Sequence, residues 1–382
     1  MFKKASSLLA PEHLLVLSSL FTSGINFIIY VIYPSLMGAG SLDLFIRDNY
    51  AGGFYLFGIA SSVSIVTTKL ISYHDIKSVT KYAQISTLIG GCVLLSLYQY
   101  IQSITALSCI LAAVLLHANG FMLAVLIRLK KIRICATLQV VQPFLFLSGI
   151  LLAISFELMW AYCYLISVAV AFVIFLRVLS KGDFYDLFSN KIVRRTTISL
   201  RSLLMLIVAS MSFPLFFQLE LFFVGEFTKV SLGEYTILQK MYSSVSVALF
   251  SGLLVYMYGE SKQGFQWRKI FTLPLLSAFV VCCLAIVLSF LGKGVDIHLL
   301  FVTVITSYIF SVAMFITFAM NVDNATLNIK LLFVAMLVYS IMLFSIDIES
   351  ALQMLLISLS FYGTYILLYY YVISSRRKAS EC

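Results

Sequence analysis

The segment Gln218–Lys240, "QLELFFVGEFTKVSLGEYTILQK", contains two apolar runs that are separated by a short polar passage. The first run ends near Gly225, and the second begins at Tyr235. Each run has an ionisable residue among its apolar neighbours, Glu220 in the first and Lys240 in the second. The meaning of these two residues depends on the solvent that surrounds the runs, and the composition of the whole chain identifies that solvent.

The composition identifies an integral membrane protein. The chain has 382 residues, of which 62% are hydrophobic and 11% are charged, with a mean hydropathy of +1.04. Soluble domains contain about 25% charged residues, so this chain cannot cover itself with a polar surface, whereas a lipid bilayer would solvate it. The net charge of +10 lies in short segments between apolar runs, which is typical of membrane topology and not of nucleic-acid binding.

Apolar runs of the length that crosses a bilayer, about 20 residues, follow one another along the chain. Because every backbone amide in hydrocarbon must find a partner within its own segment, these runs predict helices. The fold class is therefore an all-α integral membrane protein with about 12 transmembrane helices, at 13–36, 50–72, 82–101, 104–127, 135–155, 158–178, 203–225, 235–258, 270–292, 297–320, 329–346 and 350–373.

The basic residues orient these spans. With a cytoplasmic N-terminus, 22 of the 26 Lys and Arg residues fall on the cytoplasmic side and three fall on the outer side. This bias predicts that both termini are cytoplasmic. The longest connection, 179–202, is also the most basic one. It divides the chain into an N-terminal six-helix bundle (1–178), a basic cytoplasmic linker (179–202) and a C-terminal six-helix bundle (203–382), a plan that many transporters share.

The opening segment resembles a known motif. Glu220-x4-Gly225, then Gly233-x-Tyr235, then Lys240 resemble the signature around the seventh and eighth spans of Wzx-type O-antigen flippases. These flippases belong to the multidrug/oligosaccharidyl-lipid/polysaccharide (MOP) exporter superfamily, and their twelve-span plan is similar as well. The chain departs from the usual motif in having Glu where Asp is common.

This resemblance implies a multi-pass protein of the bacterial inner (cytoplasmic) membrane. Its implied activity is to move an undecaprenyl-pyrophosphate-linked oligosaccharide, an O-antigen or capsular repeat unit, to the periplasmic leaflet by alternating access. The implied partners are this lipid-linked oligosaccharide, membrane lipids and other polysaccharide-assembly membrane proteins. The driving force would be a substrate gradient or an H⁺ or Na⁺ gradient, with no cofactor.

Glu220 and Lys240 are the strongest candidates for a site, because ionisable residues in spans are costly and usually face a partner or a wet cavity. Each lies about five residues from the outer end of its span, so that an ion pair between antiparallel neighbours is geometrically available. Two interpretations stay open. The pair locks the hairpin, or Lys240 lines a cleft for an anionic head group while Glu220 positions it or exchanges a proton.

Further polar residues lie within or beside the apolar spans. Amides and hydroxyls bind sugars, and they also hold neighbouring helices together, so both interpretations apply to them. Gln139 and Pro143 share the fifth span. The additional candidates for substrate binding or gating are Asn26, His117, Asn119, Gln142, Gln218 and Asn321.

Two other classes of function compete with the flippase. An O-antigen polymerase or ligase would need a large outer loop with Arg and His, yet the basic residues and histidine of the outer loops are Arg47, Lys229, Lys293 and His298. The sequence also contains no Walker A, HExxH or GxSxG motif, so we expect no enzyme, no catalytic residue and no metal site. A drug or small-molecule exporter of the same fold stays open.

Overall fold

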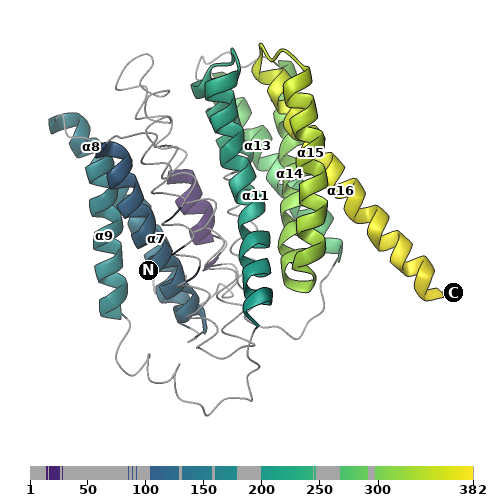
Figure 1. Ribbon diagram of the computed structural model, residues 1–382. Coiled ribbons are helices and arrows are strands. Elements are labelled where there is room, and N and C mark those ends of the chain that lie inside the picture. Colours follow the sequence, from purple (N-terminus) through teal and green to yellow (C-terminus); the bar gives the residue numbers. More distant parts are fainter. Residues whose placement is uncertain are drawn as a thin grey trace. The chain divides into compact units, whose positions relative to one another are not determined.

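A computed structural model of the chain describes residues 14–25 without 16, 104–128, 131–156, 160–178, 199–243, 245–246, 267–290 and 297–381, and the single positions 28, 85, 88 and 92. Every regular element in these ranges is a helix (Figure 1). The predicted span 50–72 lies outside the described residues, and the spans 13–36, 82–101 and 235–258 are described only in part.

The labelled helices coincide with predicted spans. They are α7 (Ile104–Arg128), α8 (Ile132–Phe156), α9 (Trp160–Val178), α11 (Leu200–Phe227), α13 (Trp267–Phe290), α14 (Ile297–Asp323), α15 (Ala325–Ser345) and α16 (Ala351–Glu381). Residues 14–25 and 232–243 add two further helical stretches. Four segments of the described part are long and apolar enough to cross a membrane, namely Ile132–Leu152, Ile297–Thr317, Ala325–Ser345 and Ala351–Ser375.

Several helices extend beyond the predicted spans. Helix α11 begins at Leu200 and not at 203, and α16 continues to Glu381 instead of ending at 373. Hydropathy marks the thickness of the hydrocarbon, whereas the backbone hydrogen bonds that define a helix form equally well beyond it. Figure 1 shows the last part of α16 extending away from α14 and α15 toward the C-terminus.

The chain forms two compact units. One contains the described residues up to Leu219, and the other contains those from Glu220 onward. Within the N-terminal unit, α7, α8 and α9 pack against one another, and within the C-terminal unit α13 packs on α14 while α16 packs on α14 and α15. Most of the predicted linker 179–202 lies outside the described residues, so its role as the domain boundary stays a prediction.

Pro143 and Gln139 have a structural role in the N-terminal unit. Pro143 lies inside α8 and has no N–H, which leaves the carbonyl oxygen of Gln139 without its usual intrahelical donor. The hydroxyl of Thr22 donates to this oxygen at 3.0 Å, and the hydroxyl of Ser18 lies 2.7 Å from the Gln139 side-chain oxygen. Helix 14–25 is thus joined to α8 at the place where proline interrupts the helical hydrogen bonds.

Helices α8 and α9 approach closely at Gly149. A Cβ atom at this position would lie 3.1 Å from the Cβ of Cys163, which is tighter than ordinary van der Waals contact. Small residues at such contacts let the helix backbones come together, and van der Waals packing then holds the helices in a membrane. Cys163 therefore fills the interface between α8 and α9.

The C-terminal unit has buried hydroxyls and aromatic rings between its helices. Ser246 lies 2.9 Å from Ser277 on α13 and 2.6 Å from Ser311 on α14, and Ser277 lies 3.0 Å from Ser307, with Oγ atoms paired throughout. Edge-to-face contacts connect the rings of Tyr242, Phe310, Tyr362, Phe361 and Tyr339. Interhelical hydrogen bonds and packing of this kind replace the hydrophobic effect that is absent between helices in lipid.

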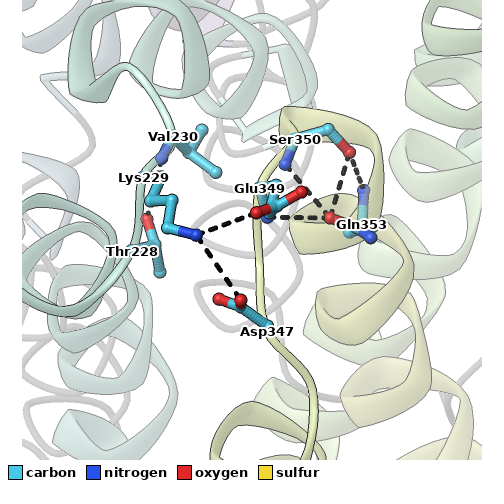
Figure 2. Close-up of polar contacts among 7 residues, drawn as sticks. All are labelled: Thr228, Lys229, Val230, Asp347, Glu349, Ser350 and Gln353. Carbon is cyan, nitrogen blue, oxygen red and sulfur yellow. Dashed lines mark hydrogen bonds and ion pairs between the residues drawn. The ribbon is translucent and has the colours of Figure 1, made fainter.

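Two loops of the C-terminal unit meet at an exposed ion pair (Figure 2). The Lys229 amine lies 2.8 Å from Glu349 Oε1 and 3.5 Å from Asp347 Oδ2. The hydrogen bond to Glu349 and the charge of Asp347 raise the pKa of Lys229, so the amine stays charged. Beside it, Ser350 and Gln353 form a capping box at the start of α16, because each side chain accepts the other's backbone N–H, at 3.3 and 3.1 Å.

The Thr22 hydrogen bond should depend on Pro143. Thr22→Val leaves the Gln139 carbonyl without a donor and should lower the free energy of unfolding by about 1–3 kcal/mol. In a Pro143→Ala background, residue 143 regains an N–H for this carbonyl, so the same substitution should cost clearly less. Chemical unfolding in detergent gives the free energy of unfolding of the wild type, the two single variants and the double variant.

Thr137→Val is the matched control. Thr137 donates to the carbonyl of Arg133 within α8, where the helical donor is present, so this substitution should have little effect. An equal cost of Thr22→Val in both backgrounds would contradict the role of Pro143.

Candidate functional site

Glu220 is fully buried near the C-terminal end of α11, with 0% of its surface exposed. Gln239 Nε2 donates to Glu220 Oε2 at 2.9 Å, and the hydroxyl of Ser358 donates to Glu220 Oε1. These two side chains come from the 232–243 helix and from α16. Three elements of the C-terminal unit therefore converge on one carboxyl group.

A layer of tyrosines surrounds this carboxyl group. The Tyr235 hydroxyl lies 3.0 Å from Ser358 Oγ, and Ser358 Oγ also lies 2.9 Å from the carbonyl oxygen of Met354. The rings of Tyr242, Tyr339 and Tyr362 are buried as well and lie close enough to interact electrostatically with Glu220. The surroundings of Glu220 are thus polar and neutral.

Helical spacing brings these residues to Glu220. Tyr235, Gln239 and Tyr242 follow one another at intervals of four and three residues, which places them on one face of a helix. Ser358 and Tyr362 are separated by four residues of α16 and share a face in the same way. Ser231 begins the 232–243 helix, since its hydroxyl accepts the N–H of Glu234 at 3.3 Å, and this cap sets where that helix starts.

The structure describes other partners for Glu220 than the ion pair with Lys240 that the sequence makes geometrically available. Gln239 and Ser358 donate hydrogen bonds to Glu220, and an ion pair with Lys240 is not among the contacts of Glu220 in the described part of the chain. Consecutive residues of an α-helix point about 100° apart, so Gln239 and Lys240 cannot both face Glu220. Lys240 is nevertheless buried, at 5% exposure.

Of the other predicted site residues, Asn119 and Gln142 have side chains that the structure describes. Asn119 is buried at 4% exposure on α7, and neither polar atom of its amide has a hydrogen-bond partner among the described residues. Gln142 is half-buried on α8. Asn26 lies outside the described residues, and for His117, Gln218 and Asn321 the structure describes the helix but not the side chain. Roles of these six residues in substrate binding or gating stay predictions.

The sequence did not predict Gln239 and Ser358, which donate hydrogen bonds to Glu220. Gln239 is the neighbour of a more conspicuous lysine, and Ser358 stands in the run "LISLSF", where it cannot be distinguished from serines that pack helices. The i to i+4 spacing of Tyr235 and Gln239 was the one signal available for Gln239. For Ser358 the sequence contains no signal, because 138 residues separate it from Glu220.

The arrangement suits a group that gains and loses a proton or holds a cation. A carboxyl group in a membrane helix commonly marks an ion or proton pathway. Here the donors that hold the carboxyl group are a neutral amide and a neutral hydroxyl, so the described contacts provide no opposite charge that would keep Glu220 permanently ionised.

The apolar helices and this fold define a multi-pass membrane protein with the fold of a MATE transporter. One solved structure that it resembles is the crystal structure of the eukaryotic MATE transporter AtDTX14, with a TM-score of 0.59, 15% sequence identity, and coverage of 97% of this chain and 98% of that one. At this identity the likeness shows a common fold. No family model and no curated protein sequence matches the chain.

The partner of Glu220 can be tested by double-mutant cycles. Glu220→Ala and Gln239→Ala should be coupled by about 0.5–3 kcal/mol in the free energy of unfolding, because each removes the same hydrogen bond. Glu220→Ala and Lys240→Ala should add within about 0.5 kcal/mol. Unfolding of the purified variants in detergent gives both cycles, and coupling to Lys240 without coupling to Gln239 would restore the ion-pair hypothesis.

Proposed function

We propose that this chain is an exporter that moves an undecaprenyl-pyrophosphate-linked oligosaccharide across the bacterial inner membrane by alternating access. The observation that supports the transporter class is the MATE fold over nearly the whole chain. The motif Glu220-x4-Gly225, Gly233-x-Tyr235 and Lys240 supports the substrate class through its resemblance to Wzx-type flippases. Such transport breaks and forms no covalent bond in the substrate.

In this proposal Glu220 couples transport to a proton gradient. Protonation removes the charge of a fully buried carboxyl group and reverses the direction of its hydrogen bond with Ser358 on α16. A ligand shifts a conformational equilibrium by the difference in its affinity for the two states, and a proton on Glu220 acts as such a ligand. A sodium ion bound at the carboxyl group is the alternative coupling ion.

Lys240 has a separate role in the proposal. Lysine binds phosphate as a compact point charge. The pyrophosphate carries the negative charge of the proposed lipid-linked substrate, so it is the group that a lysine in such an exporter would bind. The buried position of Lys240, one residue from a partner of Glu220, would place the phosphate-binding group next to the proton-binding group. Proton exchange at Glu220 could then alter substrate binding at Lys240.

An exporter of drugs or other small molecules is the second candidate. The MATE fold itself favours it as much as the flippase, since fold alone does not specify a substrate. A polymerase or ligase is disfavoured because the chain shares its fold with a transporter.

Deletion in the native bacterium tests the substrate class. We expect loss of surface polysaccharide and accumulation of complete single lipid-linked units on the cytoplasmic face, because assembly would continue while export stops. Protection of these units from a periplasmically added glycosidase reports the face of the membrane. Single units that reach the periplasm without being lengthened would indicate a polymerase, and normal polysaccharide with altered drug susceptibility would indicate a small-molecule exporter.

Glu220→Gln tests the coupling role in the same deletion strain. Glutamine has nearly the shape of protonated glutamate but cannot release a proton, so export should fall at least tenfold while protein abundance stays near normal. The matched control is Glu226→Gln on the same helix, where the side chain is exposed and export should be unchanged. Full export by Glu220→Gln would exclude the coupling role.

A further inference from the structure

The hydroxyl of Ser358 stands at the centre of three contacts. Its Oγ atom contacts Glu220 Oε1, lies 3.0 Å from the Tyr235 hydroxyl and lies 2.9 Å from the carbonyl oxygen of Met354. A serine hydroxyl has one hydrogen to donate and two lone pairs to accept with. It can therefore donate to one of these oxygens at a time, and the protonation of Glu220 decides which.

When Glu220 is ionised, its carboxylate accepts hydrogen bonds and donates none. Ser358 then has to donate to Glu220, and Tyr235 donates to Ser358. The Met354 carbonyl still accepts the backbone N–H of residue 358 within α16, as helix geometry requires. Every polar atom of this set has a partner.

When Glu220 is protonated, its O–H becomes a donor and Ser358 Oγ is the acceptor in contact with it. The Ser358 hydroxyl can then rotate to donate to the second lone pair of the Met354 carbonyl, while Tyr235 continues to donate to Ser358. Both lone pairs and the hydrogen of Ser358 are used. Gln239 donates to the other carboxyl oxygen in either case.

We propose that Ser358 is a positioning residue that donates to ionised Glu220 and accepts from protonated Glu220, so that the carboxyl group keeps its hydrogen bond to α16 in both protonation states. This inference rests on the proposed function, in which Glu220 is the proton-exchanging group. Glu220 takes one proton from water and returns it to water when the site opens during transport. The hydrogen of Ser358 stays on Ser358 throughout and changes only its direction.

Among the residues that the structure describes, the other titratable groups that interact with Glu220 are tyrosines. Tyr235 and Tyr242 come from the helix that begins at residue 232, Tyr339 from α15 and Tyr362 from α16. Tyrosine ordinarily titrates near pH 10 (about 10 in model peptides), so these hydroxyls remain neutral donors while a carboxyl group gains or loses its proton. Lys240, buried on the same helix as Gln239, is outside the hydrogen bonds that Glu220 makes in the described part of the chain.

Infrared difference spectroscopy of the full-length protein in lipid vesicles, recorded across a pH titration, tests the proposal. The C=O stretching band of protonated Glu220 is assigned by its loss in Glu220→Gln. In Ser358→Ala this band should shift to higher wavenumber, because the Glu220 O–H loses its acceptor. Ser358→Thr keeps a hydroxyl and should restore the wild-type position.

Ser360→Ala is the matched control. Ser360 lies on the same helix, and its hydroxyl donates to the carbonyl of Ile357 at 2.6 Å, so its loss should leave the Glu220 band unchanged. If Ser358→Ala does not accumulate, Ser358→Cys carries the same test, because a thiol is a weaker donor and acceptor and should give a smaller shift in the same direction.

The outcomes separate this inference from the proposed function, since the spectra need no substrate. An unchanged band in both Ser358→Ala and Ser358→Cys would overturn the switch, even if the deletion strain accumulates lipid-linked units. The expected shift would support the switch even if the deletion shows that the substrate is a different one. A Glu220 band that does not titrate at all would overturn both the switch and the proton coupling.

Discussion

The structure depends on one constraint, which is that hydrocarbon offers no hydrogen-bond partners. Every backbone amide and carbonyl in the membrane must be satisfied by the protein, and the described regular elements are helices for this reason. Where Pro143 removes a donor from α8, Thr22 of another helix replaces it. At the turn between α14 and α15, the Asn324 side chain accepts the N–H of Leu327 at 3.0 Å.

The same constraint acts on the side chains of the C-terminal unit. Glu220, Gln239 and Ser358 form one hydrogen-bonded set, and Ser246, Ser277, Ser307 and Ser311 form another. The Lys229 ion pairs differ because water surrounds them, with more than half of each participating side chain exposed. Exposed ion pairs contribute little to stability, so the buried sets hold the helices together and Lys229 adds only a connection between two loops.

A common fold does not require a common substrate. Apolar helices of suitable length and spacing can form the same bundle from very different sequences, which explains a common fold with a MATE transporter at 15% identity. The few polar residues inside the helices are then free to differ between proteins, and they decide which ion and which substrate the fold moves. In the proposed function, the set around Glu220 makes this choice in this chain.

The sequence by itself determined the membrane, the helices and the approximate spans, because these follow from apolar length and from the backbone's need for internal partners. It also identified Glu220, since a carboxyl group in an apolar run stands out locally. It could not identify the partners of Glu220. Lys240 has the opposite charge and a suitable depth, but helix rotation turns Gln239 toward the carboxyl group instead. Ser358 enters the site from α16, and only tertiary packing brings together two helices so distant in the chain, because the direction in which each helix faces depends on all of its neighbours at once.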